Sequence, residues 1–497
     1  MGRRRRRGAA ALALVSMFAA ASVAYAGGSS ARVPLRPVIS GRTALVTTDK
    51  VDPALVAAPG PSDGSALAAW TFSTSSTSPS SVQATILDRL GRRAGAAFSV
   101  DTSPPPIPGY HFSGHEGPLV SYSPSADAWI VVVQANYGSD QTCARQLRGR
   151  RIVGSCRQLY RELSVRVDPT GRTGPPTTVL QASTPTIFSP QDPPVYGPFA
   201  LSCRTGGCLI VAHECLDPTV YQCDFNKKVH EFVVALDANG SPLSQRRTAI
   251  DTGHRARCPN DIRGEVFPPS GGQASIASTN GGYLVSWATA LGGFNSCVML
   301  RSVSPAGAPS GPLTVVNRDP PGRHGLTAHN PRYNFELGPP HVCSYQRGAR
   351  ALVTWFVMGT AQLPPSAAAF AIGIYRQSYG SDGRLTGRDT RAARSIAGYD
   401  TTGYAHAFVT ETLAAAPGQN RCVVLATGIN KVDAFAYDPT GRIRQHSEFL
   451  RYHRPTTGAL HPPDEPTAVF SNTGGILFDV RISVRSTLEA IDAYPLR

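Results

Sequence analysis

The sequence lacks the short motifs that identify several classes of enzyme. The H-E-x-x-H motif of zinc metalloproteases is absent, because "HECLD" at residues 213–217 contains only its first two letters. The phosphate loop of nucleotide-binding proteins is absent as well, because no glycine in the chain is followed by a lysine. We therefore assign no catalytic residue, expect neither a metal nor a cofactor, and favour a binding protein over an enzyme.

Lysine is scarce, and basic residues outnumber acidic ones. The chain has 48 Lys+Arg against 33 Asp+Glu, a formal net charge of +15, and only four of the 48 are lysines. Such enrichment in arginine is also what a GC-rich genome produces, so the net charge is a weak argument for an anionic partner. We expect no nucleic-acid partner.

Long apolar runs are absent after residue 26, which excludes a helical membrane span of about 20 residues. The N-terminus has five arginines at Arg3–Arg7, an apolar stretch from Ala9 to Val23, and the site "AYA" at residues 24–26. These features in this order are typical of a secretory signal peptide. We expect residues 1–26 to be cleaved off after Ala26, and residues 27–497 to be a secreted, monomeric, single-domain protein.

A turn motif is repeated along the chain. The letters "DPTGR" occur at Asp168–Arg172 and again at Asp438–Arg442, and related turns recur about every 70 residues. Proline sets φ in such a turn and glycine accepts a positive φ, so each motif predicts a hairpin between two strands. The glycines of the six turns are Gly91, Gly171, Gly240, Gly307, Gly383 and Gly441.

A second hairpin pattern precedes each of these turns. Examples are "GPLVSYSPSADAWIVVV" (117–133) and "PHVCSYQRGARALVTWF" (340–356), and seven such copies are present. The second strand of each copy is short and almost wholly apolar, as expected of a strand that is buried on both faces. Each unit thus predicts four antiparallel strands, called a to d, with tight a–b and c–d turns and longer b–c and d–a links. Such a repeated unit is typical of a β-propeller blade.

The ends of the chain complement each other in this scheme. The seventh unit ends before its fourth strand, whereas an extra strand-like piece, "RPVISGRTALVTT" (Arg36–Thr48), precedes the first unit. We predict an all-β, seven-bladed β-propeller whose ring is closed by an N-terminal strand within residues 33–48, which completes the last blade and removes two exposed edges. Two smaller β-sandwich domains are the alternative architecture.

The blades resemble those of secreted bacterial β-propeller proteins, which read roughly "P-x-V-A-y … G-x-y-L-V-v-W … V-d-x-x-G". The resemblance covers about residues 33–497. It implies the fold and leaves the role open, because propellers of this kind serve in binding, in catalysis and as spacers.

The ten cysteines of this exported chain predict disulfides rather than metal ligands. The run "CRTGGCLIVAHEC", which includes His213, has the spacing of no standard zinc finger. Hairpin or link neighbours should pair, and the pairing of the last four cysteines stays open. The expected bridges are Cys203–Cys208, Cys143–Cys156 and Cys215–Cys223, and one arrangement of the others joins Cys258 to Cys297 and Cys343 to Cys422.

Histidines gather in the predicted d–a links, which lie on the face where propeller ligands commonly bind. If several converged on the central channel, they would hold a metal or make binding pH-sensitive. The alternative is that each is solvated or bonded to a backbone carbonyl. The seven are His111, His115, His254, His324, His329, His406 and His461, of which we take His115, His254, His329 and His406 as ligand-binding candidates.

The densest basic stretch of the mature chain is "CARQLRGRRIVGSCRQLYRE" (143–162), in a predicted b–c link. Rigid guanidinium groups suit carboxylates, phosphates or sulfates, so an acidic polysaccharide or a cell-envelope polymer is the expected partner. A solvated loop in an arginine-rich protein is the alternative. The arginines of the stretch are Arg145, Arg148, Arg150, Arg151, Arg157 and Arg161, of which the first four are our ligand-binding candidates.

We therefore predict an extracellular binding module for an anionic polymer or glycan. A carbohydrate-active hydrolase or lyase with its site in the central funnel is one alternative, and a structural envelope protein is another. Glu214, Glu411 and Asp479 lie within apolar strands, where an acid is costly unless it is paired. Paired carboxylates do glycosidase chemistry, but a structural ion pair is the commoner role.

Overall fold

The structure is a computed structural model, and the residues it describes fall within one compact unit, Leu35–Arg497. The described ranges are 41–46, 55–61, 64–72, 79–100, 102–103, 105–139, 146–148, 151–153, 157–185, 197–215, 229–244, 246–251, 274–289, 297–316, 333–337, 340–345, 348–361, 369–386, 390–394, 411–415, 422–428, 431–437, 443–451, 467–471, 474–482 and 488–496. The predicted signal peptide lies outside them.

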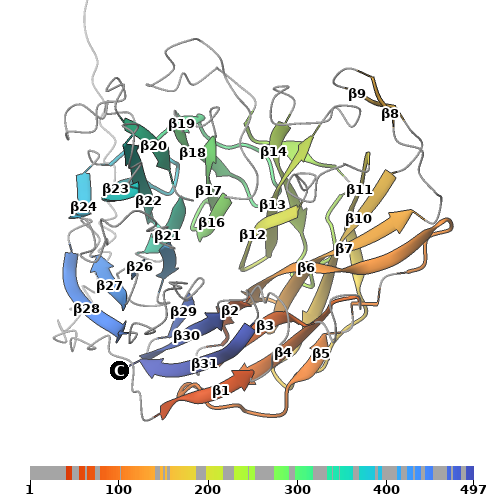
Figure 1. Ribbon diagram of the computed structural model, residues 1–497, viewed down its shortest axis with the longest axis horizontal. Coiled ribbons are helices and arrows are strands. Elements are labelled where there is room, and N and C mark those ends of the chain that lie inside the picture. Colours follow the sequence, from red (N-terminus) through yellow and green to blue (C-terminus); the bar gives the residue numbers. More distant parts are fainter. Residues whose placement is uncertain are drawn as a thin grey trace, which may run out of the picture. The chain divides into compact units, whose positions relative to one another are not determined.

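The strands form seven sheets of four or five strands in the described part of the chain (Figure 1). The first sheet contains β2 (Leu55–Pro59), β3 (Ala66–Phe72), β4 (Ser81–Leu87) and β5 (Phe98–Val100). The second contains β6 (Tyr110–Ser123), β7 (Ala128–Ser139), β10 (Arg157–Val167) and β11 (Thr177–Pro185). The third contains β12 (Gly197–Arg204), β13 (Gly207–Cys215), β14 (Val229–Leu236) and β15 (Thr248–Ala249).

The remaining sheets follow in chain order. The fourth contains β16 (Ala274–Thr279), β17 (Gly282–Thr289), β18 (Cys297–Val303) and β19 (Thr314–Val315). The fifth contains β20 (Tyr333–Leu337), β21 (His341–Tyr345), β22 (Arg350–Ala361), β23 (Ala369–Gly380) and β24 (Thr390–Arg394). The sixth contains β25 (Glu411–Ala415), β26 (Cys422–Gly428), β27 (Lys431–Tyr437) and β28 (Ile443–Arg451). The seventh contains β29 (Thr467–Ser471), β30 (Gly474–Ile482), β31 (Leu488–Leu496) and β1 (Thr43–Val46), and β8 (Gln146–Arg148) pairs separately with β9 (Arg151–Val153).

The fold class is the predicted one. All pairings are antiparallel, and the described residues contain no α-helix. Within the first six sheets neighbouring strands follow one another in the sequence, with two exceptions: β7 pairs with β10, and β20 and β21 both pair with β22. The first strands β2, β6, β12, β16, β21, β25 and β29 contact one another in this order, and β29 also contacts β2. Four-stranded antiparallel units arranged in this way are the blades of a β-propeller.

The seventh sheet takes its outer strand from the other end of the chain. β1 pairs antiparallel with β31, with Thr43 opposite Ala493. Beside it, Arg42 Nε lies 2.9 Å from Oδ1 of the fully buried Asp492. The predicted closing strand was Arg36–Thr48, and the paired residues fall within that range.

The core lies between neighbouring sheets, on both faces of each second strand. Along β3, six of seven residues are buried, as predicted for an apolar strand that packs on two sides. The second strands also carry all four tryptophans of the chain, each at most 2% exposed. They are Trp70 in β3, Trp129 in β7, Trp287 in β17 and Trp355 in β22.

The repeated c–d turns dock on the preceding sheet. In "DPTGR", Asp168 Oδ1 accepts hydrogen bonds from the backbone N–H groups of Thr170 (2.8 Å) and Arg172 (3.0 Å). Gly171 has a φ of 87° and would place a Cβ only 3.2 Å from the ring of Phe98 in the first sheet. The turn therefore needs glycine for its conformation and for its close approach to the neighbouring sheet.

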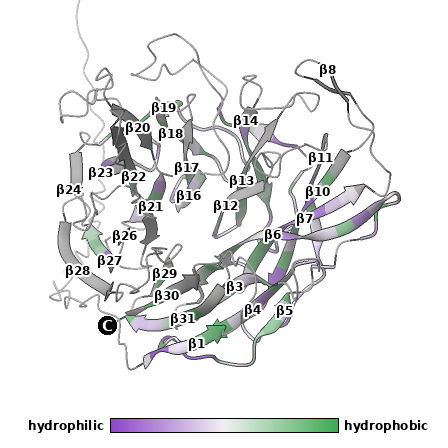
Figure 2. Cartoon of the chain, viewed as in Figure 1, coloured by the Kyte–Doolittle hydropathy of each residue, from purple (hydrophilic) through white to green (hydrophobic). Residues whose placement is uncertain are grey.

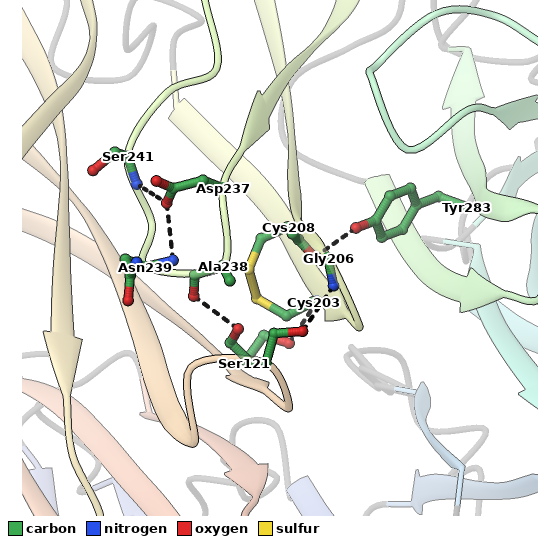
Figure 3. Close-up of a disulfide and its surroundings, with 12 residues drawn as sticks. Ser121, Cys203, Gly206, Cys208, Asp237, Ala238, Asn239, Ser241 and Tyr283 are labelled. Atoms are coloured by element: carbon green, nitrogen blue, oxygen red, sulfur yellow. Dashed lines mark hydrogen bonds between the residues drawn. A yellow bond between two sulfur atoms is a disulfide. The ribbon is translucent and has the colours of Figure 1, made fainter.

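The a–b turn of the third sheet shows how turns connect sheets on this side (Figure 3). Cys203 and Cys208 lie opposite each other in the hairpin and form a disulfide. Cys203 N donates to Ser121 Oγ of the second sheet at 2.9 Å. Tyr283 of the fourth sheet donates its hydroxyl to the carbonyl of Gly207 at 2.9 Å.

Two of the expected disulfides are confirmed. Besides Cys203–Cys208, the structure contains Cys343–Cys422, which joins the fifth sheet to the sixth and realises one half of the arrangement left open above. The positions of Cys143, Cys156, Cys223 and Cys258 lie outside the described residues, as do the side chains of Cys215 and Cys297.

Candidate functional site

The second sheet is longer than the sheet before it. Its first three strands have 14, 12 and 11 residues, whereas β2, β3 and β4 have 5, 7 and 7. The additional length lies at the end that carries the b–c and d–a links (Figure 1). We call residues 110–116, 134–139, 157–162 and 181–185 the elongated end.

The sequence explains why the sheet changes character along its length. β7 begins with the apolar run "AWIVVV" and ends with "QANYGS", so the strand turns hydrophilic toward the elongated end (Figure 2). In β6 the register shifts between Phe112 and Gly114 and between Glu116 and Leu119, and both Gly114 and Gly117 have positive φ. These are β-bulges, which bend a strand and re-aim its side chains.

One face of the elongated end carries aromatic side chains. Phe112 lies opposite Tyr137 in the β6–β7 ladder, and their ring centroids are 6.0 Å apart in an edge-to-face arrangement. The ring of His115 lies 4.6 Å from that of Phe112. Phe112 is half-buried and Tyr137 is buried. Part of the Phe112 side chain is therefore accessible on this face.

Arg161 stands on the same face, in β10. Its Nε donates to Oε1 of Gln181 at 2.8 Å, and its Nη1 donates to the carbonyl of Pro105 at 3.1 Å. Its Cζ lies 5.7 Å from the centroid of the Tyr137 ring, a cation–π distance. Burial raises the pKa of Tyr137, and the Arg161 charge opposes that shift. The guanidinium is thus held from three sides while remaining half-exposed.

His115 has an internal role in this region. It is 6% exposed, its Nδ1 lies 2.8 Å from the carbonyl of Ser80, and its Nε2 lies 3.1 Å from that of Thr102. The Ser80 hydroxyl also donates to the His115 carbonyl at 2.6 Å and accepts from its N–H at 2.7 Å. Burial lowers the pKa of His115, against the opposing effect of the two carbonyls. His115 lies in strand β6 rather than in a link, and it ties the second sheet to the first.

The predicted basic loop contains a short hairpin. β8 and β9 pair antiparallel, and Arg148 lies opposite Arg151. The hairpin belongs to the connection from β7 to β10, the two central strands of the elongated end (Figure 1). Two predicted arginine positions are therefore neighbours in one ladder. The other candidates, Arg145, Arg150, His254, His329 and His406, lie outside the described residues.

An acidic cluster between the third and fourth sheets escaped the sequence analysis. Glu231 in β14 is 3% exposed, and its N–H donates to Oδ2 of Asp251 at 3.1 Å. Burial raises the pKa of Glu231 well above its usual value, and the charge of Asp251 adds to the shift. From the fourth sheet, Arg301 Nη1 donates to the carbonyl of Ile250 at 2.8 Å. Glu231 lies on a third strand between two packed sheets, which is a place for structural pairing.

Three further observations concern a metal site, a hydrolase motif and membrane helices. No group of three or more His, Cys, Asp or Glu side chains within the described ranges is arranged to hold a metal ion. Residues 60–64 read "GPSDG", which matches the letters G-x-S-x-G of hydrolases, but they connect strands β2 and β3, whereas a nucleophile elbow joins a strand to a helix. In the described part of the chain, no helix is long and apolar enough to cross a membrane.

No family model matches the chain, and no curated protein matches it. Among solved structures, the Dos1 propeller is similar, with 10% identity, coverage of 93% of this chain and 95% of that chain, and a TM-score of 0.39. The hydrazine synthase of Kuenenia stuttgartiensis has 11% identity, coverage of 88% and 94%, and a TM-score of 0.43. The Trypanosoma rangeli sialidase in complex with the inhibitor DANA has 9% identity, coverage of 90% and 55%, and a TM-score of 0.34. At such identities no activity follows for this chain, which is a β-propeller by the topology of its own sheets.

Proposed function

We propose that this chain is an exported β-propeller that binds an anionic polymer, such as an acidic polysaccharide or a cell-envelope component, through the elongated end of the second sheet. One observation carries the proposal. The basic hairpin β8–β9 lies in the connection between the two central strands of this end, and one of these strands carries the immobilised Arg161. Preorganised cations lower the entropic cost of binding, and arginine suits oxyanions.

The same proposal includes the architecture of the protein and its secretion. We propose that the seven sheets form one ring, closed by the N-terminal strand, and that the protein is monomeric and secreted after cleavage at Ala26. The pairing of β1 with β31 supports the ring closure. The disulfides Cys203–Cys208 and Cys343–Cys422 support export, because disulfides persist in oxidising compartments.

Binding to a heparin-type polymer tests the proposal with a charge-matched control. In one variant Arg145, Arg148, Arg150 and Arg151 become serine. In the other, four exposed arginines of the c–d turns, Arg89, Arg172, Arg246 and Arg384, become serine. We expect the first variant to lose roughly ten-fold or more in affinity at low salt and the second to lose less than about three-fold. Equal losses would mean that only the overall charge matters, and the proposed site would be wrong.

A hydrolase or lyase is the second candidate, and we propose two acids of the strands for its test. Glu116 in β6 and Glu336 in β20 each lie shortly before a Gly-Pro step, Gly117-Pro118 and Gly338-Pro339, and both belong to strands that border the second strand of an elongated sheet. Glycosidase chemistry uses a pair of carboxyl groups that flank the scissile bond. Release of reducing ends from a bound polysaccharide, lost in both Glu116→Gln and Glu336→Gln, would favour this candidate. No release by the unaltered protein would leave the binding function.

A further inference from the structure

We infer that Arg161 and the aromatic side chains beside it form a subsite for a sugar ring that bears a carboxylate. This inference rests on the proposed function and names the chemical class of its ligand. It is carried by side chains of the described strands, and it does not depend on the basic hairpin.

The guanidinium of Arg161 is held in place by uncharged groups of the described residues. Two of its N–H groups are used, by Gln181 Oε1 at 2.8 Å and by the Pro105 carbonyl at 3.1 Å, and both acceptors are uncharged. Within the described ranges it forms no ion pair, in contrast to Arg42 with Asp492 and Arg92 with Asp88. A guanidinium has five N–H groups in a rigid plane, so the remaining ones are oriented for a further acceptor. A fixed, half-exposed cation that forms no ion pair with any described residue is suited to an external anion.

The surroundings of Arg161 select the kind of anion. A planar carboxylate accepts two parallel hydrogen bonds from a guanidinium edge, which gives both strength and direction. Tyr137 packs under the guanidinium at 5.7 Å. Phe112 and Tyr110, both half-buried on β6, provide apolar surface on the same end of the sheet. A pyranose ring has apolar C–H faces. A sugar carboxylate therefore matches the aromatic surface with its ring and the Arg161 guanidinium with its carboxylate.

Two contacts position this subsite. The Gln181 side chain sets the direction of Arg161 Nε. The His115 ring packs at 4.6 Å against Phe112 and is itself held by the carbonyls of Ser80 and Thr102. We therefore assign Arg161 to ligand contact, and Gln181 and His115 to positioning. In the sequence Arg161 is one of several arginines of the basic stretch, and no feature there distinguishes it from its neighbours.

The test compares three polymers and four forms of the protein. The polymers are polygalacturonate, which bears carboxylates, dextran sulfate, which bears sulfates, and uncharged dextran. The variants are Arg161→Gln, Arg161→Lys and Arg166→Gln, and the last is the matched control. Arg166 is also half-buried in β10 and also donates to a carbonyl, that of Ala126 at 3.1 Å, but at the turn end.

We expect the unaltered protein to bind both polyanions and not dextran. Arg161→Gln should weaken binding to polygalacturonate by roughly 10- to 100-fold, the range for a charge-assisted hydrogen bond, and binding to dextran sulfate by less than about three-fold. Arg161→Lys should show most of the same loss, because an ammonium keeps the charge but not the planar fork. Arg166→Gln should change neither affinity more than about two-fold.

The outcomes separate this inference from the proposed function. If the unaltered protein binds no polyanion, the proposed function fails. If it binds both and Arg161→Gln weakens both equally or neither, the carboxylate subsite is wrong while the proposed function stands. Should Arg161→Gln fail to fold, Gln181→Met replaces it. Gln181 is exposed, and its loss releases the guanidinium, so we expect a three- to ten-fold weaker polygalacturonate affinity with dextran sulfate binding unchanged. No change in Gln181→Met would overturn the inference.

Discussion

The two ends of the second sheet use their polar groups in opposite ways. At the turn end, Asp168 Oδ1 accepts hydrogen bonds from two backbone N–H groups. The hydroxyl of Ser123 donates to the carbonyl of Ala238 in the next sheet at 2.7 Å. At the elongated end, uncharged acceptors orient Arg161 through two of its five N–H groups, and among the described residues the others are not used. The turn end recurs in sheet after sheet and holds the blades together. The elongated end is where the repeat is broken, and there we place the ligand.

The largest loss of stability is expected when a turn glycine is replaced by a larger residue. Gly240, in the c–d turn of the third sheet, has a φ of 87°, and a Cβ there would lie 2.3 Å from Ser164 Oγ and 3.1 Å from Ile130 Cγ2. Gly240→Val should lower the free energy of unfolding by about 4 kcal/mol, from backbone strain plus overpacking. Denaturant titration measures it.

Gly206→Val is the matched control for this turn. Gly206 also has a positive φ, of 99°, but no atom lies within 4 Å of its Cβ position. The loss should therefore be only about 1–2 kcal/mol, from strain alone. Equal losses in the two variants would show that the docking of turns on neighbouring sheets does not stabilise the fold.

The next largest effect concerns the contact between the elongated end and the first sheet. His115→Ala removes a buried ring between the Ser80 and Thr102 carbonyls and should cost about 2–3 kcal/mol. Thermal and chemical unfolding measure the loss. His111→Ala on the same strand, where the side chain is exposed, should cost less than about 1 kcal/mol. If the two variants are equally stable, His115 does not hold the elongated end in place.

Glu231 predicts how stability depends on pH. Its folded pKa is raised by burial and by Asp251, so its contribution is fully present below the unfolded pKa of about 4.3 and is lost as pH rises toward the folded value. The decline has a limiting slope of about 1.4 kcal/mol per pH unit. Stability measured from pH 5 to pH 9 should fall less steeply in Glu231→Gln than in the unaltered protein. Parallel curves would contradict the raised pKa and reopen the question of whether this acid is available for chemistry.

The smallest effects distinguish the two ends most finely. Asp168→Ala removes the acceptor of a half-buried turn and should lower stability by about 1 kcal/mol without changing ligand affinity. Arg161→Gln should lower stability by less than about 0.5 kcal/mol while weakening the affinity for polygalacturonate. The comparison fails if Asp168→Ala weakens binding or if Arg161→Gln is the more destabilising of the two.

Much of the fold was predictable because it repeats. The turn glycines mark the c–d hairpins, and the apolar runs mark second strands such as β3 and β7, whose tryptophans are buried. The sequence did not reveal that each turn glycine also packs on the preceding sheet, as Gly171 does on Phe98. That contact joins residues of different repeats, so the sequence pattern within one repeat cannot predict it.

The candidate site was predicted only in outline. The basic stretch was identified by composition, but the fixed position of Arg161 depends on Gln181, Pro105 and Tyr137, which come from three other segments. His115 was placed in a link because the bulges at Gly114 and Gly117 interrupt the alternation of β6. Glu231 was overlooked because one acid in an apolar strand gives no sign of the Asp251 that lies beside it.

Hydrogen exchange with and without saturating polygalacturonate reports on both ends of the second sheet in one experiment. If the ligand binds at the elongated end, we expect slower exchange in peptides covering residues 110–116, 134–139 and 157–162, and unchanged exchange in the turns at 124–127 and 168–172. Slower exchange at the turns with none at the elongated end would contradict it.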